Sequence, residues 1–124
     1  MLMTVDTFTP LSNQTISLTK NQSGNLIITD LTSAELILNL PPVEAGIKYE
    51  IIIKNNTNSL KLVSKNSSYA TTALIYIGQL STTLISEVTL NTATSHVSDR
   101  IILSCDGTHW HTSIISDNVS DYTI

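Results

Sequence analysis

Short apolar runs, each broken after a few residues by Asn, Ser, Gly or Pro, recur along the whole chain. Within the runs, apolar residues alternate with Thr and Ser, as in the segment 15–19, which is the period of a half-buried β-strand. Ile, Val, Thr and Tyr favour strands because branched and aromatic side chains fit a pleated surface. The regular breaks predict an all-β fold, a single antiparallel β-sandwich or jelly-roll-like domain of about eight or nine short strands.

The composition excludes several other classes of protein. Charged residues make up only 13% of the chain, too few for a coiled coil or a long helical bundle, and the hydrophobic share of 41% is too high for a disordered chain. No apolar run reaches the ~20 residues of a membrane helix, and the first residues lack the pattern of a signal peptide. A formal net charge of −4 without a Lys/Arg cluster predicts no nucleic-acid or membrane partner.

We expect one domain with two extensions. These are an N-terminal arm (1–12), the β-sandwich (13–116) and a C-terminal tail (117–124). No internal repeat is apparent in the sequence.

Two hairpins are predicted. The polar turn 55–58 is expected to join strands at 48–54 and 60–64. Asp106-Gly107 is expected to join strands at 101–105 and 108–115, because a tight hairpin turn needs residues that tolerate positive φ.

The lone cysteine and two neighbouring histidines are the main candidates for chemistry. Cys105 is expected to be a small buried strand residue of a protein made in a reducing compartment, rather than a nucleophile activated by a histidine. His109 and His111 share one strand face, and His96 or Asp106 could complete a metal site with them. We interpret the two histidines as an outward polar face and predict no metal and no catalytic residue.

Five short motifs follow one another in a fixed order. They are a Ser-Gly turn, a strand ending in Leu-Pro-Pro, a glycine corner before an aromatic-led strand, an Ile-x-Ile-Gly segment and a Ser-x-Asp-Gly-Thr-x-Trp hairpin. In this chain they are Gln22–Gly24, Leu38–Pro42, Ala45–Ile51, Ile75–Gly78 and Ser104–Trp110. This order resembles the small β-domains of virion surface proteins, which occur in the head and tail fibres of tailed phages and in minor capsid or decoration proteins of large DNA viruses.

The resemblance covers residues 15–115 and implies a β-sandwich that assembles as a homotrimer, with no catalytic residue and no cofactor. It implies structural roles for eight residues, Pro41, Pro42, Gly46, Tyr49, Gly78, Asp106, Gly107 and Trp110. Elementary physics agrees for some of them. Proline cannot continue a strand ladder, and a buried tryptophan contributes ~3 kcal/mol or more.

The expected function is that of a non-enzymatic structural component of a virus particle, assembled in the host cytoplasm. We expect the 124-residue chain to be free-standing, which favours a minor capsid or decoration protein that caps or cements the major capsid subunits. A fibre, spike or tail component is the first alternative. A carbohydrate-binding module for host attachment is the second, with Tyr69 as its candidate exposed ring.

Two sets of residues are expected to make contacts outside the domain. Apolar residues on second strand faces predict the homotrimer, because a solitary sandwich would leave such faces polar; they are Ile37, Ile52, Val63 and Ile115. Isolated apolar residues in the two terminal segments are expected to attach the protein to the major capsid protein or other virion proteins by adding a strand to a neighbouring sheet; they are Leu2, Val5, Phe8, Tyr122 and Ile124.

Overall fold

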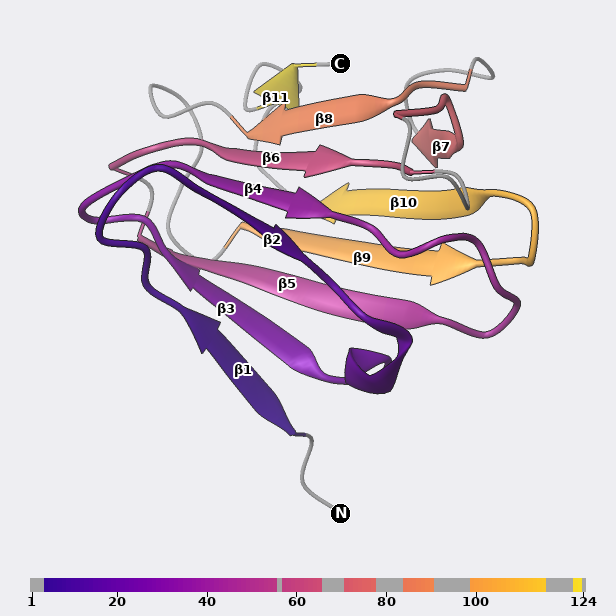
Figure 1. Ribbon diagram of the computed structural model, residues 1–124, viewed down its shortest axis with the longest axis horizontal. Coiled ribbons are helices and arrows are strands. Elements are labelled where there is room, and N and C mark those ends of the chain that lie inside the picture. The colour runs from indigo at the N-terminus through magenta and orange to yellow at the C-terminus, as the bar shows by residue number, and fades with distance from the viewer. Residues whose placement is uncertain are drawn as a thin grey trace.

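The computed structural model describes residues 4–55, 57–65, 71–77, 84–90 and 99–115, and the backbone of 122–123. Its described residues form eleven strands in two sheets and one short 3-10 turn, η1 (Lys20–Gln22), so the all-β prediction is confirmed (Figure 1). Within these residues no helix has the length and hydropathy needed to cross a membrane.

The larger sheet has six strands. In spatial order they are β1 (Val5–Phe8), β3 (Leu26–Asp30), β5 (Lys48–Asn55), β9 (Arg100–Cys105), β10 (Trp110–Ile115) and β7 (Ile75–Ile77). The smaller sheet has five strands, in the order β11 (Tyr122–Thr123), β8 (Glu87–Leu90), β6 (Leu60–Val63), β4 (Leu36–Asn39) and β2 (Gln14–Ser17).

The first six strands alternate between the two sheets. As a result, β1, β3 and β5 pair in parallel in the larger sheet, while β2, β4 and β6 pair in parallel in the smaller one (Figure 1). Val5 lies opposite Leu26, and Leu26 lies opposite Glu50. The chain therefore winds through three stacked coils, β1–β2, β3–β4 and β5–β6.

The antiparallel arrangement expected from the sequence is thus wrong for half of the molecule, and the predicted hairpin of β5 and β6 is wrong as well. The turn between these strands crosses from one sheet to the other. It stacks on the turn of the preceding coil, where the Asn58 side-chain amide donates to the main-chain oxygen of Leu31 at 2.9 Å. Asn13 has the same role one coil earlier, accepting from the Glu35 amide at 3.1 Å. Asn58, which was predicted to lie in a hairpin turn, is therefore a corner residue of a coil.

The last strands are paired mainly in the antiparallel sense. The hairpin predicted at Asp106-Gly107 is confirmed, because β9 and β10 pair antiparallel on either side of it. Gly107 has a φ of +105°, a conformation that favours glycine.

One apolar core lies between the sheets. The inward residues of both sheets contribute to it, among them Leu36 and Leu38 from β4 and Ile51 and Ile53 from β5. Strict alternation along β9 and β10 places every second residue in this core and the others on the outer face of the larger sheet.

Candidate functional site

The residues of the sequence motifs meet at one end of the molecule. The corner that contains Gly46 is held to the end of β9, because the Gly46 amide donates to the Cys105 oxygen at 3.0 Å and the Cys105 amide donates to the Ile47 oxygen at 2.8 Å. Tyr49 and Trp110 are fully buried beneath this end. Gly78, the remaining glycine of the motifs, lies outside the described residues.

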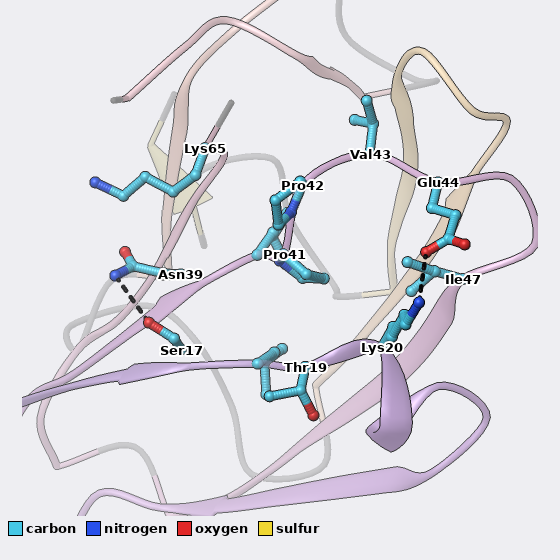
Figure 2. Close-up of a pocket in the computed structure, with 12 residues that line it drawn as sticks. Ser17, Thr19, Lys20, Asn39, Pro41, Pro42, Val43, Glu44, Ile47 and Lys65 are labelled. Carbon is cyan, nitrogen blue, oxygen red and sulfur yellow. Dashed lines mark hydrogen bonds and ion pairs between the residues drawn. The ribbon is translucent and has the colours of Figure 1, made fainter. Parts of the chain in front are cut away.

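The Leu-Pro-Pro motif lines a pocket of about 430 Å³ at the ends of β2 and β4 (Figure 2). Pro41, Pro42 and Val43 form one wall, and the exposed Lys20–Glu44 ion pair, 3.7 Å long, closes the side beside Ile47. The pocket can hold an aliphatic group. It brings together no pair of carboxylates and no nucleophile with a base.

The two histidines do not converge on a metal. The outward-facing His111 contacts Asp106 through Nε2 and Oδ2, which are 2.8 Å apart, and the His109 ring lies against Tyr76, with 5.3 Å between ring centroids. Nowhere in the described ranges do three or more His, Cys, Asp or Glu side chains form a group that could hold a metal ion. His96, the other candidate ligand, falls outside those ranges.

Asp106 is the hydrogen-bonding centre of this corner. Its pKa is held well below the usual range, first by the hydrogen bond from His111 and then by the Thr108 and His109 amides and the Thr108 hydroxyl. Because the carboxylate stays ionised, it acts as an acceptor that fixes the hairpin turn and orients the imidazole of His111. Cys105 is buried, as expected, and does not face these groups.

The outer faces of the two sheets differ in how many aliphatic side chains they carry, although the larger sheet also carries polar residues there, such as Thr7, Lys48 and Ser104. The outer face of the larger sheet carries six aliphatic side chains in neighbouring rows, which we call the aliphatic face: Val5, Leu26, Ile28, Ile52, Ile102 and Ile115. The outer face of the smaller sheet is mostly polar and has two aliphatic positions, Ile37 and the buried Val63. Its other residues are Thr15, Ser17, Asn39, Lys61, Glu87 and Thr89. Ile115 is 56% exposed and Val5 is 50% exposed.

Among the residues that the structure describes, one ion pair lies within the aliphatic face. Arg100 of β9 donates to Glu50 of β5 at 2.7 Å, and both side chains are only partly exposed. Each is bordered by aliphatic neighbours in the sheet, since Glu50 pairs with Ile102 and Ile52 pairs with Arg100. Strand alternation could have placed Ile102 outside, but the pairing of β5 with β9 was needed to bring Glu50 and Arg100 together.

The expected contact residues are placed as follows. Ile52 and Ile115 belong to the aliphatic face, Ile37 lies on the opposite polar face, and Val63 is buried. Of the terminal residues, Val5 and Phe8 lie in β1, which pairs with β3 at the edge of the larger sheet, so this part of the N-terminal segment is a strand.

Phe8 packs against the core. The backbone of Tyr122 pairs with that of Leu90 in β8. Leu2, Ile124 and Tyr69 lie outside the described residues.

Comparison of the chain with models of known protein families and with curated protein sequences finds no match.

Proposed function

We propose that the protein is a non-enzymatic structural component of a virus particle, a minor capsid or decoration protein that binds through its aliphatic face. The observation that carries the proposal is the contrast between the two outer faces. Parallel sheets are normally covered on both sides, yet the parallel strands β1, β3 and β5 present aliphatic side chains outward. Such a face favours a partner that removes it from water.

The ion pair also makes the aliphatic face selective for the charge of its partner. A partner that covers the aliphatic face has to desolvate Glu50 and Arg100, which already satisfy each other at 2.7 Å. Burying a charge without its partner costs free energy. A partner surface that is neutral or of complementary charge can therefore cover the ion pair, whereas a like charge placed beside Glu50 or Arg100 would weaken binding. A homotrimer on the particle, with aliphatic faces directed to neighbouring copies or to the major capsid protein, is the arrangement that we propose.

Two matched variants test the role of the face. Ile52→Lys places a charge on the aliphatic face, and Ile37→Lys makes the same change on the polar face of the smaller sheet. Both isoleucines are partly exposed, so both variants are expected to fold. In co-sedimentation with particles that lack the protein, Ile52→Lys should bind at least tenfold more weakly while Ile37→Lys binds normally. Equal binding of both variants would contradict the proposed face.

Light scattering of the purified chain tests the homotrimer. A mass of three times the 13.5 kDa chain is expected, and Ile52→Lys should lower it. A monomer at micromolar concentration, both free and after release from particles, would rule the trimer out.

The copy number per particle separates the two virion roles. A decoration protein is present on most capsid subunits, whereas a fibre, spike or tail component is present at one or a few positions. Quantitative mass spectrometry of purified particles gives the ratio to the major capsid protein. A ratio near one supports the decoration role, and a ratio of a few copies per particle supports the fibre or tail alternative.

A further inference from the structure

A shallow hollow of about 240 Å³ lies on the outer face of the larger sheet, at the corner formed by β9, β10 and β7. It arises from a contrast in side-chain size. Ser104 and Ser113 are small, and they lie beside three larger side chains, Ile102, His111 and Tyr76. Ser104 pairs with His111 and Ser113 pairs with Ile102, so the hollow spans two neighbouring rows of the sheet.

Two rings, those of Tyr76 and His111, line one side of this hollow, and the ring of His109 lies against Tyr76 just outside it. Tyr76 pairs directly with His111 across β7 and β10, and its ring centroid lies 5.8 Å from that of His111 and 5.3 Å from that of His109. All three side chains retain exposed surface. A tyrosine ring offers a flat apolar surface with a negative face and a polar hydroxyl at its tip. The rings therefore form an amphipathic platform rather than part of the core.

The polar groups around the platform are held in place. Ionised Asp106 accepts only, so His111 donates from Nε2 to Oδ2 over their 2.8 Å contact. In the neutral ring this leaves Nδ1 as the acceptor. The hydroxyls of Ser104 and Ser113 add groups that both donate and accept. The hollow thus combines an apolar wall, an oriented imidazole and two hydroxyls.

We propose that this hollow binds one pyranose unit of a saccharide. A pyranose presents polarised C–H groups on one face, which suit a tyrosine ring, and hydroxyls around its rim, which suit imidazole and serine. The volume is below the ~300–1,000 Å³ of sites for drug-sized ligands and corresponds to a single sugar ring. The chain carries a formal charge of −4, and no Lys or Arg lines the hollow, which favours a neutral sugar over an anionic one.

The proposal does not depend on the virion role, because it concerns the isolated chain. The hollow lies towards the β7 edge of the sheet, and β5 separates it from β1 and β3 at the other edge. A partner seated over β1, β3 and β5 would leave Tyr76 accessible, whereas one that extended to Ile102, which belongs to both the aliphatic face and the hollow, would compete with the saccharide. One face could therefore serve attachment at one side and saccharide binding at the other.

The test is a glycan array of neutral and acidic oligosaccharides probed with the purified chain, followed by calorimetry with any neutral glycan bound. Ser104→Val and Ser113→Val fill the hollow and keep good strand formers in β9 and β10. Each should weaken the Kd at least tenfold. Ser17→Val makes the same change on the outer face of the smaller sheet and should leave the Kd unchanged. Tyr76→Ala should abolish binding, and Tyr76→Phe should retain part of it.

Three outcomes would overturn the proposal. They are no neutral glycan bound on the array, a bound glycan whose Kd is unaffected by Ser104→Val and Ser113→Val, or equal weakening by the Ser17→Val control. Circular dichroism of each variant verifies that the fold is retained, so that a loss of binding reports on the hollow. None of these outcomes bears on particle binding, which the Ile52→Lys experiment measures separately.

Discussion

The rings of Tyr49 and Trp110 stack in the core with 6.0 Å between centroids and 24° between planes. They come from β5 and β10, which are separated in the sheet by β9. The Tyr49 hydroxyl also donates to the main-chain oxygen of Thr19 at 2.5 Å, just beyond the end of β2. This pair therefore ties the coiled first half of the chain to the C-terminal hairpin and links the two sheets.

Trp110→Ala should lower the free energy of unfolding by about 3–5 kcal/mol, because it removes the largest fully buried side chain and leaves a cavity beside Tyr49. Urea denaturation followed by circular dichroism measures the loss. Trp110→Phe keeps a ring against Tyr49 and should cost clearly less. A Trp110→Ala protein with wild-type stability would mean that the ring does not anchor the fold.

Two buried threonines should respond in opposite directions to the same change. The hydroxyl of Thr112 is buried without a hydrogen-bond partner in the described part of the chain, whereas that of Thr29 donates to the Ile52 main-chain oxygen at 3.3 Å. Valine has nearly the same shape but no polar group. Thr112→Val should therefore stabilise the protein by about 1 kcal/mol, and Thr29→Val should destabilise it by a similar amount. Thermal unfolding of both variants provides the comparison, and a loss of stability in Thr112→Val would count against this account.

Tyr49 should ionise only at high pH, late in an alkaline titration of the protein. Burial raises its pKa to about 12, above the value of about 10 expected for an unfolded chain. The neutral phenol thus contributes stability that is present below pH 10 and is lost as the pH rises towards 12. Absorbance at 295 nm should show a late tyrosine step that coincides with alkaline unfolding. Tyr49→Phe should remove that step while leaving the earlier ones in place.

Asp106 should make the hairpin sensitive to acid. Its pKa is lowered in the folded protein, so its contribution to stability is present above the unfolded value of about 3.9 and is lost as the pH falls below it. Asp106→Asn should lower stability at neutral pH and flatten the acid limb of the stability profile. His111→Phe removes the largest cause of the shift and should flatten that limb in part. An unchanged acid limb in Asp106→Asn would assign acid sensitivity to other carboxyls.

The sequence predicts where the strands lie better than which strands pair with each other. Alternation located β5 and β9 to within a residue or two, because inward and outward positions differ in hydrophobicity whatever lies next to the strand. The turn at 55–58 is different. Its asparagines suit a hairpin and a coil corner equally well, and only the contact of Asn58 with Leu31 shows which one forms.

The candidate surfaces were predictable only in part. Ile52 and Ile115 stood out as apolar residues on second faces, since alternation alone identifies them. Tyr76 did not stand out, because its significance depends on the parallel pairing of β7 with β10, which brings it to His111 from 35 positions away in the chain. A local sequence pattern does not indicate which distant strands pair. The three neighbouring rings could therefore be recognised only once the strand pairing was known.

The stacked coils of β1 to β6 make the length of this protein adjustable. Neighbouring coils pair strand by strand, and the third coil also pairs with β9 and β8. Asn13 and Asn58 bond the first and third corners to the corner of the middle coil. A further coil inserted before the third one would leave the pairings of β5 with β9 and of β6 with β8 in place, so the C-terminal hairpin would not be disturbed. A lineage could lengthen or shorten the aliphatic face by whole coils, matching a changing partner while the corner with Tyr76 stays as it is.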